Sequence, residues 1–392
     1  MSNHCVKRNK PLYYGHQYID DADIDAVVQV LKSDYLTCGP KIPEMEKKLC
    51  SITGAQYAVA VSSGTAALHA ACWAAGIGPG DEVIVSPMTF AASANCILYC
   101  GAHPVFADID GETYNISPQR IEANITPRTK AVVAVDFTGQ AVALSEIQAI
   151  CKAHGLILIE DAAHAIGTRY QGQPVGSIAD LTTFSFHPVK TVTGGEGGAI
   201  TTNDPHLFQR LTLFRTHGIT RDTELLEQKD IGDWYYEQIA LGYNYRMTDI
   251  QAALISSQLD KLERFSKRRK QIVDAYDQAF AHTPGLILQK TIPESDTTRH
   301  LYLLRLDLQR LNASRRQIFE ELKEQNIYCN VHYIPTYLFP YYRSLGYQAG
   351  ICPNAEALYH TSLTIPLYFA MTDEDVSYVI AKVKEVIGRH VR

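Results

Sequence analysis

One lysine stands in a sequence setting that can make its side chain a nucleophile. Residues 183–190 read Thr-Phe-Ser-Phe-His-Pro-Val-Lys, and a glycine-rich turn at 194–198 follows. An alternating strand therefore runs into a short loop ending at Lys190, whose aromatic and small neighbours favour partial burial. Burial disfavours the charged form of an amine and lowers its pKa, and a neutral amine can form a Schiff base. The competing interpretation is an ordinary surface lysine.

A carboxylate and a histidine follow a second apolar segment. In Ile159-Glu160-Asp161-Ala162-Ala163-His164, Asp161 comes at the end of a predicted strand and His164 just beyond it. A carboxylate in that position can pair with a cation, and pairing with a ring nitrogen would keep that nitrogen protonated. A helix N-cap or a structural ion pair explains the aspartate equally well.

A run of small residues, Ser62-Ser63-Gly64-Thr65-Ala66-Ala67, lies between a predicted strand and a predicted helix. Small side chains allow close approach of an anion, and the helix N-terminus offers free N–H groups with partial positive charge. The run matches neither the Walker pattern nor the dinucleotide glycine pattern. It therefore indicates a phosphate site or, alternatively, a helix capped by Ser63.

Alternating strands and helices must position these three groups. Short aliphatic runs bounded by Gly, Asp or Pro predict strands, and longer segments between them predict helices. The predicted strands are 57–61, 82–86, 104–107, 131–135, 156–159 and 181–185, and the predicted helices are 65–75, 91–100 and 144–154. Such alternation indicates a mostly parallel sheet covered on both faces, whose ligands bind beyond the carboxyl ends of the strands.

The rest of the chain predicts a second, smaller α+β domain. Helices are expected at 204–216 and at 248–281, the latter bending near Arg264, and Thr283-Pro284-Gly285 interrupts the chain. Strands at 301–308 and 328–332 and helices at 315–326 and 373–387 are predicted next. We expect a large domain at 1–285, with an N-terminal arm at 1–20, and a small domain at 286–392.

Composition excludes several classes of protein. The 392 residues carry a net charge of −6, which argues against a nucleic-acid-binding surface. No run of about 20 apolar residues predicts a membrane span, and the first residues lack a secretory signal. The nine cysteines are scattered without a Cys-x-x-Cys pair, so we expect free thiols, a cytoplasmic location and no metal site.

The motifs taken together resemble the DegT/DnrJ-type sugar aminotransferases, which depend on pyridoxal 5′-phosphate (PLP). The resemblance covers nearly the whole chain. It rests on six segments in this order: 63–68, 161–165, 185–190, 196–198, 215–218 (Arg-Thr-His-Gly) and 242–247 (Gly-Tyr-Asn-Tyr-Arg-Met). It implies fold type I of the PLP-dependent transferases, an α/β fold with a mostly parallel sheet of the seven-stranded type.

The resemblance also implies roles for individual residues. Lys190 matches the catalytic lysine that forms the Schiff base, and Asp161 matches the partner of the pyridine nitrogen. Asn244 matches a residue that reaches the cofactor phosphate from the other subunit, which implies a homodimer with shared active sites. The remaining implied cofactor contacts are the phosphate-binding Gly64, Thr65, Ala66 and Ser185, the stacking Phe90, and His164 beside the ring.

Within the family, the Ser-Phe-His start of the lysine loop resembles the branch that acts on UDP-linked 4-keto sugars. The segments 34–39, 300–302 and 331–337, together with Tyr14, resemble the branch of pseudaminic acid biosynthesis. That branch aminates a UDP-linked 4-keto-6-deoxy-N-acetyl hexose with glutamate as donor. The implied substrate contacts are Tyr14, Asp34, Tyr35, Leu36, Thr37, His187, Arg246, His300, Val331, His332 and Tyr333. Pro188 and Thr193-Gly194-Gly195 depart from some relatives.

Other functions remain open from the sequence. A UDP-4-keto pentose or another 4-keto sugar would use the same cofactor residues. Related sugar dehydratases carry histidine in place of the Schiff-base lysine, so Lys190 favours transamination. A catalytically silent regulatory homologue would fit the fold, although the chain carries no basic helix-turn-helix segment and its cofactor set is intact. A nicotinamide-dependent enzyme would need a glycine fingerprint that the chain lacks.

Overall fold

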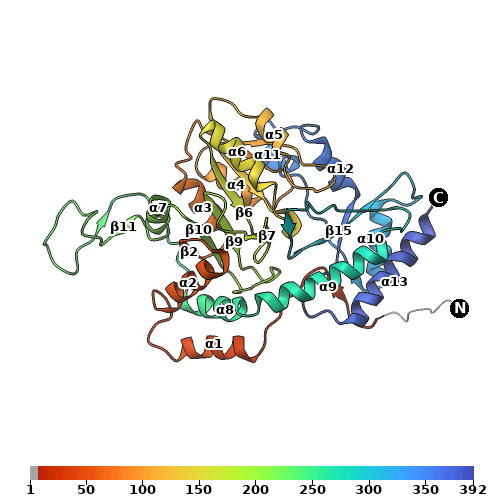
Figure 1. Ribbon diagram of the computed structural model, residues 1–392, viewed down its shortest axis with the longest axis horizontal. Coiled ribbons are helices and arrows are strands. Elements are labelled where there is room, and N and C mark those ends of the chain that lie inside the picture. The colour runs from red at the N-terminus through yellow and green to blue at the C-terminus, as the bar shows by residue number, and fades with distance from the viewer. Residues whose placement is uncertain (1–7) are drawn as a thin grey trace.

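A central sheet of seven strands organises the computed structural model, which describes residues 8–392 (Figure 1). The first seven residues of the expected N-terminal arm lie outside the described residues. The strand order in the sheet is β2-β10-β9-β6-β5-β3-β4. The strands are β2 (Tyr57–Val61), β3 (Glu82–Val85), β4 (His103–Phe106), β5 (Thr129–Val135), β6 (Ile157–Asp161), β9 (Leu181–Ser185) and β10 (Gly198–Thr202).

Six strands run in one direction and β10 runs against its neighbours. The strands β3, β4, β5, β6 and β9 pair in parallel, whereas β10 is antiparallel to both β2 and β9. The carboxyl ends of β2, β6 and β9 therefore lie at one edge of the sheet, where the phosphate-type loop, Asp161 and the lysine loop follow. This arrangement confirms the α/β fold with a mostly parallel sheet.

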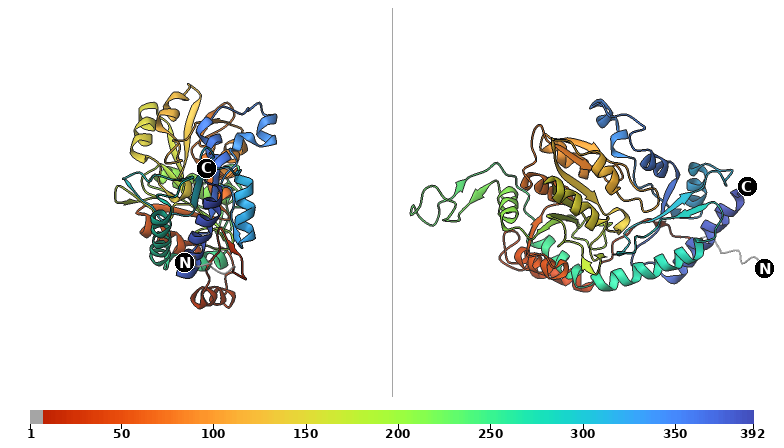
Figure 2. Two further views of the ribbon diagram at one scale, coloured as in Figure 1. Left: turned by 90° about the vertical axis from the view of Figure 1, so that its right-hand side faces the viewer. Right: turned by 45° about the horizontal axis from the view of Figure 1, so that its top comes forward.

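Helices cover both faces of the sheet (Figure 2). The helices α3 (Gly64–Ala74), α4 (Ala92–Tyr99) and α7 (Pro205–Arg215) contribute to one buried cluster, and α2 (Lys41–Thr53), α6 (Leu144–His154) and α8 (Asp249–Leu259) contribute to another. Each cluster fills the space between the sheet and one helical layer, so the strand ends are held between two packed cores.

The C-terminal part has its own three-stranded antiparallel sheet, made of β13 (Leu286–Leu288), β15 (Tyr302–Leu306) and β17 (Ser362–Ile365). A third core combines these strands with α9 (Leu262–Phe280), α10 (Arg315–Glu324) and α13 (Asp373–His390). Leu12 belongs to this core because β1 (Leu12–Tyr13) pairs in parallel with β16 (Ile327–Tyr328). The division into domains at residue 285 stays a prediction.

The remaining elements are short and lie around these layers. They are α1 (Asp21–Leu31), α5 (Pro118–Ala123), η1 (Phe137–Gly139), β7 (Arg169–Tyr170), β8 (Gln173–Pro174), β11 (Ile219–Thr220), β12 (Glu237–Gln238), β14 (Ser295–Asp296), η2 (Thr336–Leu338), α11 (Pro340–Ser344) and α12 (Pro353–Thr361). The segment with β11 and β12 projects from the body of the molecule as a long arm (Figure 1). None of the helices in residues 8–392 is both long and apolar enough to cross a membrane.

Two sequence-based expectations are wrong in detail. The helix expected at 248–281 is two helices, α8 and α9, which separate at Asp260 and Lys261 rather than bending at Arg264. The strand expected at 328–332 is limited to the two residues of β16, because Asn330 pairs with Thr364 and His332 turns its ring toward Thr364.

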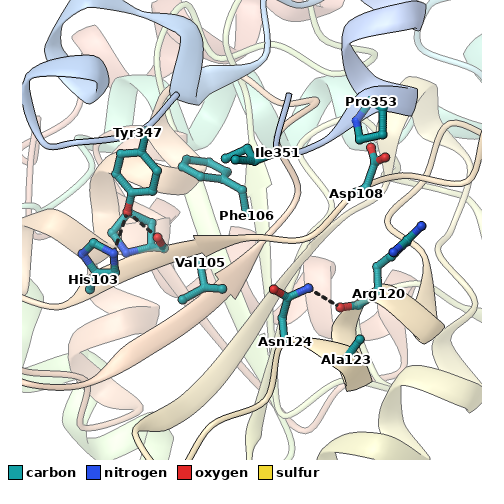
Figure 3. A pocket seen from close by; sticks show the side chains of 11 residues that line it. His103, Val105, Phe106, Asp108, Arg120, Ala123, Asn124, Tyr347, Ile351 and Pro353 are labelled. Atoms are coloured by element: carbon teal, nitrogen blue, oxygen red, sulfur yellow. Dashed lines mark hydrogen bonds between the residues drawn. The ribbon is translucent and has the colours of Figure 1, made fainter. Parts of the chain in front are cut away.

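One edge strand of the central sheet, β4, is covered by the segment around Tyr347 (Figure 3). The Tyr347 hydroxyl donates to the carbonyl of Pro104, and proline leaves no N–H to template another strand. The Tyr347 ring stacks on His103 with centroids 5.5 Å apart. A surface cavity of about 540 Å³ lies between this segment and α5.

Candidate active site

A cavity of about 640 Å³ opens at the carboxyl ends of β2, β6 and β9. Lys190 lies in its wall, on the loop after β9, with Asp161 beside it. Burial lowers the pKa of the Lys190 amine to about 8, although the Asp161 carboxylate opposes this shift. A substantial fraction of this amine is therefore neutral near pH 8, which is the state that a nucleophile or a proton acceptor requires.

Asp161 is fixed on both of its carboxyl oxygens. The Ser93 hydroxyl donates to Oδ2 at 2.6 Å, and the Ala163 N–H donates to Oδ1 at 3.1 Å. The side chain is 4% exposed, and burial raises its pKa while these two hydrogen bonds and Lys190 oppose the rise. A carboxylate held in this way presents its charge in one direction, as the partner of a ring nitrogen must.

The start of α3 forms an anion cradle. Ser63 caps the helix by accepting the Ala66 N–H at 3.1 Å, which confirms the capping interpretation of this segment. Within residues 8–392, the N–H groups of Gly64 and Thr65 have no protein acceptor. A Cβ at Gly64 would lie 2.8 Å from the Cβ of Ser185, so this backbone and the Ser185 hydroxyl converge only because position 64 is glycine. The geometry suits a phosphate group.

Aromatic and imidazole rings form the opposite wall of the cavity. The Phe90 ring is 66% exposed, and its centroid lies 6.4 Å from that of Tyr333. The Tyr333 hydroxyl lies 3.2 Å from Nε2 of His164, and the centroid of Phe137 lies 6.4 Å from that of His164. A planar ligand would therefore find Phe90 available for stacking and His164 held in place.

Three buried histidines face the cavity, and burial lowers the pKa of each one. The pKa of His332 falls to about 3, and those of His164 and His300 fall well below 6.5. The His164 and His300 rings lie 4.5 Å apart, and each has a buried Nδ1 that lacks a hydrogen-bond partner among the described residues. These neutral rings can offer hydrogen bonds to a ligand without adding charge.

The structure brings together most of the residues singled out from the sequence. The cavity wall contains Tyr14, Gly64, Thr65, Phe90, Asp161, His164, Ser185, His187, Lys190, His300, Val331, His332 and Tyr333. Ala66 follows Thr65 in α3 and is buried beneath the cradle.

A second group of expected site residues lies outside this cavity. It consists of Asp34, Tyr35, Leu36, Thr37, Asn244 and Arg246. The segment 34–37 is exposed and lies against the start of α8, where the Asp249 N–H donates to the carbonyl of Leu36 at 3.0 Å. Asn244 is exposed too, next to Tyr245, whose carbonyl accepts the Ser62 N–H at 2.8 Å.

The sequence reasoning missed several residues of the wall, including Ser93, Thr89 and Asn330. Ser93 is the most consequential because it contacts Asp161, and Thr89 lies 2.6 Å from its hydroxyl. The four-residue spacing of Thr89 and Ser93 at a helix start was visible in the sequence. Nothing in the sequence linked that spacing to Asp161, which lies 68 residues further on.

Comparison with known proteins identifies this architecture. Residues 17–384 match the DegT/DnrJ/EryC1/StrS aminotransferase family. The spore coat polysaccharide biosynthesis protein SpsC of Bacillus subtilis (strain 168) is 43% identical over 383 residues, which cover 97% of this chain and 98% of that protein.

Two further similarities bear on substrate and cofactor. The UDP-4-amino-4,6-dideoxy-N-acetyl-beta-L-altrosamine transaminase of Campylobacter jejuni subsp. jejuni serotype O:23/36 (strain 81-176) is 38% identical over 369 residues, covering 93% of this chain and 95% of that protein. Spr1654 from Streptococcus pneumoniae, solved in a PLP-form, superimposes with a TM-score of 0.88 at 34% identity, covering 97% of this chain and 99% of that chain.

Proposed function

Because the chain belongs to the DegT/DnrJ/EryC1/StrS aminotransferase family, we propose that it transfers an amino group from glutamate to a UDP-linked 4-keto-6-deoxy-N-acetyl hexose. The enzyme is an aminotransferase, and its cofactor is PLP. The observation that carries the proposal is one cavity that holds Lys190, Asp161 and the α3 anion cradle together.

The residues of the cavity fit PLP. The free N–H groups of Gly64 and Thr65, together with Ser185, would hold its phosphate. Asp161, fixed by Ser93 and Ala163, would hold the ring nitrogen, and Phe90 would stack on the ring. When bound, PLP supplies an electron sink for the carbanion that forms when the amino-group donor loses its α-proton.

The side chains of this protein would then divide the proton transfers between them. The Lys190 amine, whose pKa is lowered by burial, would take the α-proton of the donor and pass it to the cofactor, and in the second half-reaction it would deliver a proton to the former keto carbon of the sugar. The negative charge of Asp161 would favour the protonated form of the ring nitrogen. The Tyr333 hydroxyl lies 3.2 Å from Nε2 of His164, and both side chains line the cavity.

The proposed sugar rests on a similarity and on the shape of the cavity wall. The Campylobacter relative is named for UDP-4-amino-4,6-dideoxy-N-acetyl-beta-L-altrosamine, which places a UDP-linked amino sugar in that protein's reaction. In this chain, Tyr14 lies 4.9 Å from the His332 ring, and both line the cavity beside Val331. Aromatic and imidazole groups of this kind suit a sugar face and a uracil base.

The substrate proposal predicts selective turnover. Purified enzyme with PLP, glutamate and the UDP-4-keto-6-deoxy-N-acetyl hexose of the pseudaminic acid pathway is expected to yield the 4-amino sugar, identified by mass spectrometry and NMR. A UDP-4-keto pentose and the gluco-configured 4-keto hexose serve as matched alternatives. Turnover restricted to the pentose would reject the proposed sugar, and absence of turnover with every keto sugar would favour a silent regulatory homologue.

We also propose a homodimer in which each chain completes the other's active site. The expected site residues that lie outside the cavity are on two exposed segments, which also expose large apolar side chains: Tyr35 and Leu36 on the first, and Leu241 and Tyr243 just before Asn244 on the second. Leu241 is 75% exposed. Monomers seldom leave large apolar surfaces in water, so a second copy of the chain is the proposed cover.

The shared site predicts complementation between two inactive variants. Asn244→Ala is expected to weaken cofactor retention, because the proposed phosphate contact is lost. A hybrid of this variant with Lys190→Ala should recover activity, since one of its two sites then carries both intact residues. Mixing under mild dissociating conditions followed by an activity assay measures the recovery. An inactive hybrid of proven mixed composition would contradict a site built from two chains.

We propose a cytoplasmic location for the enzyme. The Sγ atoms of Cys72 and Cys96 lie 3.3 Å apart and are free thiols, an arrangement typical of a reducing compartment.

A further inference from the structure

Two buried carboxyl groups lie on the far side of the central sheet from Asp161. Glu160 and Asp161 are neighbours in β6, so their side chains leave opposite faces of the sheet. Asp136 follows β5, on the face that carries Glu160 and the core formed with α6 and α8. Both Asp136 and Glu160 are 0% exposed, so neither side chain touches the cavity or the solvent.

Each carboxyl group has one oxygen bound by a neighbour and one that is not. Asp136 Oδ1 accepts the Val142 N–H at 2.9 Å, and Glu160 Oε2 accepts the Thr182 hydroxyl at 2.9 Å. Among the described residues, Asp136 Oδ2 and Glu160 Oε1 receive no hydrogen bond from any donor. In the β5–β6 ladder Ala134 pairs with Glu160, and the Asp136 N–H donates to the Asp161 carbonyl at 3.1 Å, so Asp136 and Glu160 lie on neighbouring strands and on the same face. Two carboxylate oxygens can face each other in a dry core only when a proton lies between them.

The pair joins three segments that deliver site residues. The Asp136–Val142 bond closes the loop 137–141, in which the Thr138 carbonyl accepts the His300 N–H at 2.7 Å. The Phe137 ring in this loop lies 6.0 Å from the Tyr333 ring. The Glu160–Thr182 bond links β6 to β9, the two strands that lead to Asp161 and to Lys190.

We propose that Asp136 and Glu160 share a proton and act as a positioning pair that holds the β5 loop and the ends of β6 and β9 beneath the cofactor site. Neither residue touches the cofactor or the substrate, and the inference does not depend on which sugar is used. Loss of the shared proton would leave two facing carboxylates, with Asp161 as the other nearby carboxylate, and their repulsion would loosen the loop.

Burial raises the pKa of both groups, that of Glu160 to about 7 and that of Asp136 well above its usual value. The folded protein therefore binds these protons more tightly than the unfolded chain does. It follows that the pair stabilises the fold most at low pH, and that this contribution is lost as the pH rises from about 4.5 through about 7. The Asp161 carboxylate adds to this rise in both groups, and Thr182 from β9 opposes it for Glu160.

The first test measures unfolding of the cofactor-free protein between pH 5 and pH 8. Glu160→Gln keeps the shape and supplies an amide donor to Asp136, so its stability is expected to fall less with pH than that of the parent protein. Glu82→Gln is the matched control, because Glu82 is buried in the same sheet but hydrogen bonds from Thr126 and Arg128 lower its pKa. If the stability of Glu160→Gln falls with pH as steeply as that of the parent protein, the proposal of a shared proton is overturned.

The second test separates positioning from simple packing. In Asp136→Asn the side-chain amide can still bridge Glu160 and Val142, whereas Asp136→Ala leaves the Glu160 carboxylate and the Val142 N–H unpaired. PLP titration is expected to give a dissociation constant close to the parent value for Asp136→Asn and about tenfold larger for Asp136→Ala. Equal PLP affinities of folded Asp136→Asn and Asp136→Ala would overturn the positioning role. If Asp136→Ala does not fold, PLP affinity is measured as the pH is raised to 9. The parent is expected to lose affinity as the shared proton is lost, and Asp136→Asn is expected to lose less. An equal loss of affinity in the two proteins would contradict the proposal.

Discussion

Lys190→Ala is expected to abolish turnover and to remove the visible absorbance of the lysine-linked cofactor. The substitution deletes both the nucleophile and the proton acceptor of the cavity, and general acid–base catalysis alone accounts for about 10²- to 10⁴-fold in rate. The loss should therefore exceed about 10³-fold. Absorbance titration with PLP and a steady-state assay with glutamate and the keto sugar measure the two effects.

Lys290→Ala provides the control for this variant. Lys290 is an exposed lysine paired with Glu112 at 2.7 Å, and its loss should leave the rate and the spectrum unchanged. The pH dependence supplies a second check, since the neutral amine is the reactive form. Capture of PLP by the cofactor-free protein should quicken as the pH rises through about 8, the value to which burial lowers the Lys190 pKa. Measurable transamination by Lys190→Ala would refute its assigned role.

Asp161→Asn is expected to preserve the fold and to reduce the rate by roughly 10²-fold or more, the usual cost of removing one electrostatic contact at a reacting centre. The amide matches the carboxyl group in size, and its oxygen can still accept the Ala163 N–H, while its NH2 group can donate to the Ser93 hydroxyl in place of the bond that Ser93 donates to Asp161. It carries no charge, so the ring nitrogen loses the partner that keeps its proton. Steady-state rates and thermal unfolding are measured together.

Asp108→Asn is the matched control for Asp161→Asn. Asp108 is equally buried, at 4% exposed, but it accepts the N–H groups of Asn354 and Ala355 at the start of α12, far from the cavity wall. Its substitution should lower the stability and leave the rate per folded molecule intact. A near-normal rate for Asp161→Asn would show that another group holds the ring nitrogen.

The sequence predicted the strands that carry the site because apolar runs and turn residues define them locally. The strands β2 and β9 and the helix α6 match their expected limits, and the three polar segments converge as parallel strand ends must. The strand β10 was missed because Gly198–Thr202 follows a glycine-rich turn and has no long aliphatic run. Its antiparallel direction is a consequence of the tertiary structure rather than of its own residues.

Contacts between distant segments are what the sequence could not supply. The hydrogen bond from Ser93 to Asp161 joins α4 to β6, and the Asp136–Glu160 pair joins β5 to β6. Each depends on the register of neighbouring strands and on which face a side chain leaves. Resemblance to the family assigned roles to individual residues, but it did not indicate what holds Asp161 in place.

The pairing of β1 with β16 has a consequence for biosynthesis. Leu12 is 2% exposed in a core whose other members come from residues 272–387, and its strand partner is Ile327. During synthesis on the ribosome, β1 cannot pair with β16 until residues 327 and 328 have been added to the chain. Contacts of such large sequence separation slow folding. Tyr14, which follows this strand into the cavity wall, therefore takes its place there only after residues 327 and 328 have been synthesised.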